Sequence, residues 1–221
     1  REYVVLKREM PSEQASSYQE IIKNAHQSES VPGQMLQALH GLRSVSLHPL
    51  KLAGQSDEEY IKQSARLMIL FELLENIESK GEKALIFVES LEMHGILAEL
   101  LQRRFKMATP PLIISGEVGG DNRKKRVDIF QMRRGFDAMI LSPRAGGVGL
   151  TLHAANHVIH LSRWWNPAVE DQCTDRVYRI GQKKKVFVYL PLAVHPSYPA
   201  ESFDLRLHDL LERKRSLSRT L

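Results

Sequence analysis

Residues 142–182 read SPRAGGVGLTLHAANHVIHLSRWWNPAVEDQCTDRVYRIGQ, and two parts of this stretch carry chemistry. The first is a glycine-rich turn at 144–149, which is predicted to follow a strand. Because glycine has no Cβ, backbone N–H groups in such a turn can approach an anion closely. The second is the pair Arg176 and Arg179, on a helix predicted over 167–181. Two planar cations one helical turn apart suit the oxygens of a phosphoryl group, so the stretch predicts a phosphate site.

Short apolar runs alternate with helical segments on both sides of this stretch. The runs are predicted strands at 84–88, 112–115, 138–141, 157–160 and 186–190. This alternation predicts an α/β fold, a mostly parallel sheet with helices on both faces. In such a sheet, ligands bind at the carboxyl ends of the strands. The expected chemistry therefore lies along the edge where four serines follow strands, namely Ser90, Ser115, Ser142 and Ser162.

Further helices are predicted toward both ends of the sequence. One helix is expected over about 12–26, and a second ends near 46–50. A capping box formed by Ser56 and Glu59 begins another helix, because each residue can satisfy the backbone N–H of the other. A final amphipathic helix is expected over about 202–216, with a strongly charged outer face.

Two helices between the strands have predicted N-caps. Ser90 precedes an amphipathic segment that crosses over to the next strand, and Asp121 precedes a basic helix over 122–133. Side chains of both types accept hydrogen bonds from the first N–H groups of a helix. The sequence thus predicts successive strand–helix–strand units.

Composition limits the class of protein. A chain of 221 residues with 43% hydrophobic content can bury one sizeable core. Cys173 is the single cysteine, which excludes an internal disulfide and a cysteine-based zinc cluster, and no apolar run reaches the length of a membrane span. We expect a reducing, aqueous compartment. The sequence begins with Arg1 and has no signal-peptide pattern, so a fragment of a longer chain is expected.

The net charge of +5 is modest, but the basic residues are clustered. Clusters stand at 123–126, 133–134, 183–185 and 213–215. Each cluster alone is typical of a solvated face. Taken with the family resemblance of the motifs at 145–182, the four clusters favour a DNA track.

Three motifs give this sequence a family resemblance. AGGVGL at 145–150, WNPAVEDQ at 165–172 and DRVYRIGQ at 175–182 resemble the last two helicase motifs of the Swi/Snf family, in the branch common among bacterial proteins. The resemblance implies the second, C-terminal RecA-like lobe of an ATP-driven translocase on double-stranded DNA. It also implies inter-lobe linker or insertion helices at 1–55, the lobe itself at 56–200, and a C-terminal brace helix at 201–221.

The resemblance implies roles for the arginine pair. Arg176 and Arg179 would point at the γ-phosphate of ATP held on the other lobe, with Arg179 as the arginine finger and Gln172 orienting both guanidinium groups. The alternative from the residues alone is a solvated helix face paired with neighbouring acidic side chains.

The glycine-rich turn is implied to face both nucleotide and DNA. Gly147 and Gly149 would approach the nucleotide, while Ser142 and Arg144 would contact a DNA phosphate. The usual pattern has threonine where Pro143 stands, and proline offers neither a hydroxyl nor an N–H to a phosphate. The alternative is a turn that packs a helix tightly onto the sheet.

Further DNA contacts are implied on neighbouring loops. Ser115, Gly116 and Arg123 resemble the family's middle motif, which touches one DNA strand, and Trp165 is the tryptophan that the family motif marks. The alternative for the first three is a strand-end turn beside a solvated arginine. The helix over 201–221 is expected to brace the lobe, although its basic run could also reach DNA.

The sequence contains neither a G-x-x-x-x-G-K-[ST] loop nor an acidic magnesium motif. ATP and Mg²⁺ are therefore expected to be bound mainly by an upstream lobe, and the fragment alone is expected to be inactive. His153, His157 and His160 do not predict a metal site, because a strand over 157–160 would scatter their rings onto different faces.

The expected partners are double-stranded DNA and the upstream RecA-like lobe of the same chain, with no membrane. A bacterial cytoplasm, in association with the nucleoid, is the expected location, and the target that the motor moves is not specified. Two other classes stay open. An RNA or single-strand helicase is disfavoured by Asp175 and by the RIGQ ending, and a non-catalytic DNA-binding scaffold would need an upstream lobe without a phosphate loop.

Overall fold

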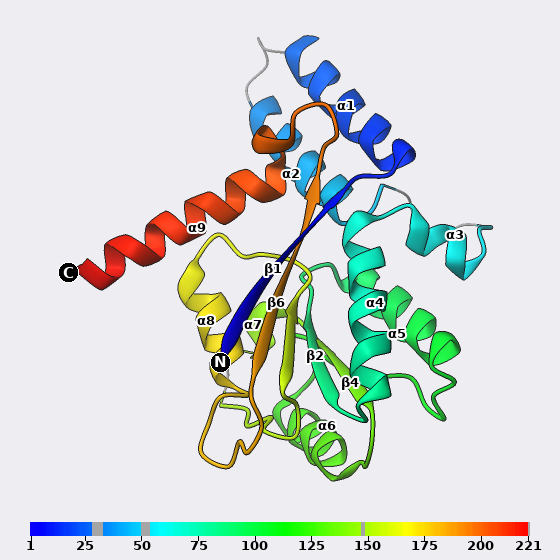
Figure 1. Ribbon diagram of the computed structural model, residues 1–221, viewed down its shortest axis with the longest axis vertical. Coiled ribbons are helices and arrows are strands. Elements are labelled where there is room, and N and C mark those ends of the chain that lie inside the picture. The colour runs from blue at the N-terminus through cyan, green and yellow to red at the C-terminus, as the bar shows by residue number, and fades with distance from the viewer. Residues whose placement is uncertain (28–32, 50–53, 147–148, 221) are drawn as a thin grey trace. The chain divides into compact units, whose positions relative to one another are not determined.

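The computed structural model describes residues 1–27, 33–49, 54–146 and 149–220 (Figure 1). Its described strands form a six-stranded sheet in the order β1-β6-β5-β2-β4-β3. They are β1 (Glu2–Glu9), β2 (Lys83–Phe87), β3 (Leu112–Ile114), β4 (Asp137–Leu141), β5 (His157–His160) and β6 (Phe187–Val194). The pairs β2–β4, β2–β5, β3–β4 and β5–β6 are parallel, so the predicted α/β fold is confirmed.

The described part of the chain divides into two compact units. Unit 1 comprises residues 1–5 and 72–190, and unit 2 comprises residues 6–71 and 191–221. The helices of unit 1 are the second half of α4 (Ala65–Ser79), α5 (Leu91–Arg104), α6 (Gly120–Met132), α7 (Pro143–Gly146) and α8 (Pro167–Asp175). Those of unit 2 are α1 (Ser12–Gln27), α2 (Gln34–Leu47), α3 (Asp57–Lys62), the first half of α4, the 3₁₀ turn η1 (Pro199–Glu201) and α9 (Phe203–Thr220).

Strand β2 forms the centre of the sheet in unit 1. All of residues 83–87 are buried, as expected for an apolar run with a neighbouring strand on each side and cover on both faces. Pairing continues past the strand ends. The Ser142 amide donates to the Ile114 carbonyl at 3.0 Å, and the Ser162 amide donates to the Phe87 carbonyl at 3.1 Å. The serines predicted to follow strands therefore lie along adjacent strand ends.

Two of the predicted helix caps are confirmed and one is wrong. Ser56 and Glu59 form the predicted capping box, with bonds of 3.2 and 3.0 Å, and the Ser90 hydroxyl caps α5. However, the N-cap of α6 is Gly119, not Asp121. The helix starts earlier than predicted, so Asp121 lies within its first turn, where a carboxylate complements the positive end of the helix dipole.

Strand β1 was not predicted from the sequence. Its residues alternate between exposed and half-buried, which is the pattern of a strand at the edge of a sheet. The Glu2 amide donates to the Val186 carbonyl and the Met10 amide to the Val194 carbonyl, each at 2.8 Å. Strand β6 correspondingly continues past 190, where the predicted strand ends.

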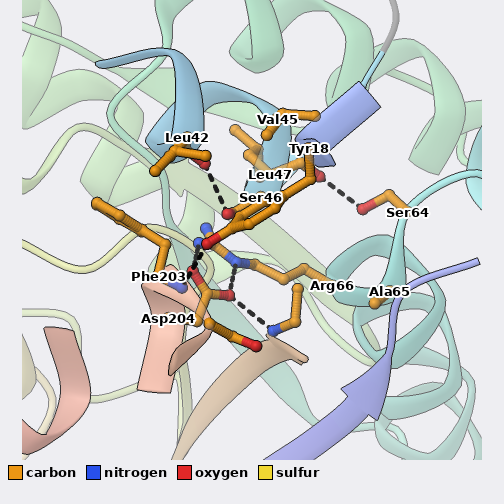
Figure 2. Close-up of polar contacts among 12 residues, drawn as sticks. Tyr18, Leu42, Val45, Ser46, Leu47, Ser64, Ala65, Arg66, Phe203 and Asp204 are labelled. Carbon is orange, nitrogen blue, oxygen red and sulfur yellow. Dashed lines mark hydrogen bonds and ion pairs between the residues drawn. The ribbon is translucent and has the colours of Figure 1, made fainter. Parts of the chain in front are cut away.

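Figure 2 shows a polar network in unit 2. Arg66 of α4 forms an ion pair with Asp204 in the first turn of α9, with Nε 2.7 Å from Oδ2, and both side chains are buried. The same oxygen accepts the Ala193 amide at 2.6 Å, at the end of β6. The Tyr18 hydroxyl of α1 accepts the Phe203 amide at 3.0 Å. The helices near both ends of the chain are thus tied into one unit.

Unit 2 also has an apolar core of its own. It is formed by Met10, Ala15, Tyr18, Val45, Ala65, Ala193, Phe203, Leu207 and Leu211. Among the described residues, no helix is both long enough and apolar enough to cross a membrane.

Candidate functional site

The candidate residues of unit 1 lie past the carboxyl ends of adjacent strands. Ser115 follows β3 and Ser142 follows β4, and both serines are buried. Ser162 follows β5 and leads into Trp165, which is 38% exposed. Because β5, β2, β4 and β3 are consecutive in the sheet, these segments share one edge.

The segment predicted as a glycine-rich turn begins as the short helix α7, so the turn prediction is wrong for its first part. The Ser142 hydroxyl accepts the Ala145 amide at 3.4 Å, which allows the chain to coil directly after β4. Gly149 has φ +58, the left-handed conformation that glycine adopts without strain. Gly147, predicted to approach the nucleotide, lies outside the described residues.

Arg144 projects from α7 to the surface. Its guanidinium carbon lies 5.0 Å from the centre of the Trp164 ring, and Arg144 is exposed. Stacking of this kind holds a cation in place while leaving its N–H groups available to an anion.

Helix α8 begins as predicted. The Asn166 side chain accepts the Ala168 amide at 3.0 Å, and Pro167 occupies the first turn, where its missing N–H has no cost. The predicted end at Gly181 is wrong, because α8 ends at Asp175 with Arg176 as its C-cap.

The bonding pattern explains the early end of α8. The Val177 amide bonds to the Thr174 carbonyl at 3.1 Å, and the Arg179 amide bonds to the Val177 carbonyl at 3.1 Å. Val177 is fully buried in the core of unit 1, so tertiary packing turns the chain inward. Residues 176–182, here named the arginine turn, therefore hold the two arginines on a compact turn and not on one helix face.

The two arginines of this turn differ in their surroundings. Arg176 is 7% exposed, whereas Arg179 is exposed and its Nη1 lies 3.4 Å from the Thr151 hydroxyl. Burial lowers the pKa of Arg176, and the nearby positive charge of Arg179 lowers it further. An anion placed between the two groups would relieve that repulsion. Gln172, predicted to orient them, is exposed on α8.

Gln182 fixes the arginine turn to the segment before β5. Its side-chain amide donates to the Ala155 carbonyl at 2.7 Å and to the His153 carbonyl at 3.1 Å. In addition, the Leu152 amide donates to the Arg176 carbonyl at 3.0 Å. Gln182 was not predicted to have a role, although its place at the end of the RIGQ motif was a signal.

A buried ion pair was also missed. Arg163 donates through Nε to the Glu170 carboxylate at 2.6 Å, and the two side chains are only 2% and 3% exposed. The sequence offered no signal for this pair, since both residues stand among charges that resemble a solvated face.

Asp175 forms an ion pair with Arg1 at 2.5 Å.

Arg123 supports the turn after β3. Its Nε donates to the Val118 carbonyl at 2.6 Å, and its Nη2 lies 3.4 Å from the carbonyls of Ser115 and Gly116. The structure thus brings Ser115, Gly116 and Arg123 together, as predicted. The Nε and Nη2 donors of Arg123 therefore bond to carbonyls of the turn itself.

His157 and Cys173 are buried and form hydrogen bonds within unit 1. His157 lies in β5, bonded to Glu82 and, at 3.0 Å, to the Tyr189 hydroxyl. Burial lowers its pKa. Cys173 is buried, its thiol donates to the Pro143 carbonyl at 3.3 Å, and burial together with the Glu170 charge raises its pKa to about 12. A thiol held in this way is packed and not reactive.

Comparison with known proteins identifies the family. The helicase conserved C-terminal domain family matches residues 65–181, more than half of the chain. The chain belongs to this family. Relatives and solved structures confirm the predicted resemblance to the C-terminal lobe of Swi2/Snf2-type proteins within this family.

Two curated relatives illustrate the likeness. The putative ATP-dependent helicase/translocase YwqA of Bacillus subtilis is 36% identical over 216 residues, covering 95% of this chain and 22% of the relative. The Zorya protein ZorD of Escherichia coli is 36% identical over 193 residues, covering 85% and 17%. The chain thus spans about a fifth of the length of these relatives.

Solved structures agree with the fold. The Sulfolobus solfataricus SWI2/SNF2 ATPase core domain matches with a TM-score of 0.78 and 28% identity, over 99% of this chain and 44% of that one. The same core in complex with double-stranded DNA matches with a TM-score of 0.74 and 29% identity, over 87% and 41%. The C-terminal part of the Fun30 ATPase domain, at 22% identity and a TM-score of 0.77, covers 96% and 88% and supports the fold alone.

Arg176 and Arg179 supply the arginine turn with two cations. In the part of the chain that the structure describes, no group of three His, Cys, Asp or Glu side chains could hold a metal ion. The arginines of the turn fit the phosphate oxygens of a nucleotide, whereas Mg²⁺ requires oxygen ligands.

Proposed function

We propose that this chain is the C-terminal motor lobe of an ATP-dependent translocase on double-stranded DNA. The observation that carries the proposal is the arginine turn, where buried Arg176 and exposed Arg179 stand close enough for the charge of one to lower the pKa of the other. Two such cations, on a turn tied to the segment before β5, suit the oxygens of a phosphoryl group.

Each arginine has its own part in this proposal. Arg176, held by its carbonyl bond to the Leu152 amide, is the fixed cation. Arg179 is exposed, and its Nη1 lies 3.4 Å from the Thr151 hydroxyl, so it can reach a γ-phosphate as an arginine finger. Neutralising charge in the transition state in this way raises turnover roughly 10³-fold or more. Gln172 orients the two groups from the preceding helix.

The segments that follow β3, β4 and β5 supply the DNA contacts. Arg144 is exposed and stacked on Trp164, which supports a phosphate contact beside Ser142. The turn at Ser115 and Gly116, held by Arg123, contacts one strand through its backbone, and Trp165 faces the track. Contacts of this kind position a protein on DNA without reading its sequence. The complex of the Sulfolobus core with double-stranded DNA supports the choice of partner.

ATP and Mg²⁺ are proposed to be held mainly by an upstream RecA-like lobe of the same protein. Phosphoryl transfer needs a phosphate-loop lysine and acidic magnesium ligands, and this sequence has neither motif. Closure of the two lobes on ATP would bring Arg176 and Arg179 to the nucleotide. The proposed location is a bacterial cytoplasm, in association with the nucleoid.

We propose the division of the chain that follows from this function. Residues 1–55 connect the lobes, 56–200 form the RecA-like lobe and 201–221 form the brace. The bond from the Phe203 amide to the Tyr18 hydroxyl supports a brace that is tied to the connecting helices, and the ion pair of Arg66 and Asp204 ties it to the start of the proposed lobe.

The test is ATP turnover by the full-length protein without DNA, with single-stranded DNA and with duplex, beside turnover by residues 1–221 alone. We expect duplex to stimulate ATP turnover by the full-length protein, and we expect no ATP turnover by residues 1–221 alone. Turnover by the isolated chain would contradict the upstream site. Stimulation by single strands together with strand separation would favour a helicase, and no turnover under any condition would favour a DNA-binding scaffold.

A further inference from the structure

The buried ion pair of Arg163 and Glu170 lies between the two sets of candidate residues in unit 1. Arg163 stands just past β5, and Glu170 lies in α8. The Nε–Oε2 distance is 2.6 Å, and both side chains are almost fully buried. An ion pair shielded from water is strong and tolerates little displacement of its partners.

On one side, the pair adjoins the segment proposed to contact DNA. Arg163 directly precedes Trp164, whose ring is covered by Arg144 at 5.0 Å. The loop that continues from Trp164 carries Trp165 and ends at the N-cap Asn166. A shift of Arg163 would therefore move the tryptophans and the arginine stacked on them.

On the other side, the pair adjoins the arginine turn. Glu170 lies in the same helix as Gln172, and α8 passes directly into Arg176. Two further buried contacts hold this helix. His160 of β5 bonds to the Thr174 hydroxyl at 3.0 Å, and the Cys173 thiol donates to the Pro143 carbonyl of α7 at 3.3 Å. Helix α8 is thus fixed both to the end of β5 and to the start of α7.

We propose that Arg163 and Glu170 are positioning residues that couple the DNA-contacting segments to the arginine turn. The inference rests on the proposed function. Neither residue touches a phosphate. The pair holds α8 at one position relative to β5, so that movement of the Trp164 loop on DNA is passed to Arg176 and Arg179. Misplacing a catalytic group by about 1 Å can reduce turnover on the order of 10²-fold.

The test uses Glu170→Gln in the full-length protein, because glutamine can still accept a bond from Arg163 while the charge is lost. We expect the ratio of duplex-stimulated to DNA-free turnover to fall roughly tenfold or more, through kcat. The KM for ATP and the Kd for duplex should stay within about twofold, since the contacting residues are unchanged. Arg163→Gln combined with Glu170→Gln leaves no unpaired buried charge and should show the same loss.

The matched control is Asp204→Asn, which weakens the other buried arginine–carboxylate pair, in unit 2. It should lower the melting temperature as Glu170→Gln does, without changing the stimulation ratio. Equal losses of stimulation in both variants would reduce the effect to general destabilisation and overturn the proposal. Stimulation at the wild-type level in Glu170→Gln and in the double variant would also overturn it.

Hydrogen exchange separates this proposal from the proposed function. If the wild-type protein has no duplex-stimulated turnover, the function fails, and amide exchange then decides whether the pair couples the segments. Glu170→Gln should speed exchange about tenfold or more both at 144–146 and at 172–182, and Asp204→Asn should leave both segments unchanged. A change confined to α8 would overturn the coupling.

Discussion

The side-chain amide of Gln182 donates hydrogen bonds to the backbone carbonyls of Ala155 at 2.7 Å and His153 at 3.1 Å, and lies 3.4 Å from that of Val177. This arrangement ties the last residue of the arginine turn to the chain before β5. The turn itself has lost the regular bonding of α8. Its shape therefore depends on side-chain contacts of this kind.

Gln182→Ala should loosen the arginine turn. Losing the bonds to two carbonyls should lower the free energy of unfolding by about 1 kcal/mol, because a net hydrogen bond contributes about that much. ATP turnover by the full-length protein should fall roughly tenfold, since Arg176 and Arg179 would sample other positions. Gln37→Ala, on the exposed side of α2, is the control. Turnover that is unchanged would mean that the turn needs no such support.

Arg179→Ala should abolish most ATP turnover by the full-length protein. The expected loss is roughly 10³-fold or more, with duplex affinity nearly unchanged, because a finger acts on the transition state. Steady-state turnover and duplex titration measure the two effects. Arg103→Ala, which removes a half-exposed arginine of α5, should change neither quantity. An Arg179→Ala variant with normal turnover would refute the assignment.

Arg144→Ala should weaken duplex binding on all sequences alike. The slope of log K against log salt should become shallower by about 0.9, the value for one phosphate contact. Arg123→Glu should do the same and also reduce stability, because its guanidinium bonds to the carbonyls of Val118, Ser115 and Gly116. Salt titrations on two unrelated duplexes, beside thermal melting, distinguish the residues. A loss confined to one DNA sequence would contradict phosphate contact.

Stability should fall as pH decreases below neutrality. Burial lowers the pKa of His157 in the folded state, while the unfolded value is about 6.5. The unfolded chain therefore binds the proton more tightly than the folded chain. The contribution of His157 to the free energy of unfolding is present above about pH 6.5 and is lost as the pH falls below that value. His157 changes the free energy of unfolding by at most about 1.4 kcal/mol per pH unit.

Denaturant unfolding between pH 7.5 and 5.5 checks the titration of His157. His157→Gln should flatten the decline, whereas His40→Gln, on the exposed surface of α2, should leave it as in the wild type. Glu82, bonded to His157, also has a lowered pKa, but its contribution is lost only in more acidic solution. Equal slopes in all three proteins would show that His157 does not titrate as its burial requires.

Asp204→Ala should strongly destabilise unit 2. The change leaves the Arg66 guanidinium buried without its carboxylate and also removes the acceptor of the Ala193 amide. Losing one partner of a buried pair costs about 3–5 kcal/mol. Glu58→Ala, which breaks the exposed pair with Lys62 in α3, should cost about 0.3–0.5 kcal/mol. Denaturant unfolding compares the two, and similar small losses would mean that water reaches Asp204.

Features that depend on local pattern could be predicted from the sequence. Residues 84–87 of strand β2 are an unbroken apolar run, and Ser56 and Ser90 cap helices through contacts within one turn, so the periodicity and the residue types were sufficient. The end of α8 depends on the burial of Val177 in a core built from distant strands. Strand β1 is ordered by its partner β6, which lies far away in the sequence.

The sequence predicted which residues belong to the candidate site better than it predicted how they are arranged. Ser115, Gly116 and Arg123 were expected together and are joined by hydrogen bonds. The pair of Arg163 and Glu170 could not be found, because charged residues separated by a loop give no sign that they are buried. What the sequence lacked in each case was the position of one element relative to another.

The composition of unit 2 has a consequence for synthesis of the chain. Residues 6–71 leave the ribosome before residues 72–190 of unit 1, whereas Phe203, Asp204 and Leu207 follow them. Until then, the Phe203 amide that bonds to Tyr18 and the Asp204 carboxylate that pairs with Arg66 have not been synthesised. Since domains tend to fold as they emerge, residues 6–71 carry an incompletely covered apolar core while residues 72–190 are translated. Translation of α9 is the event that closes it.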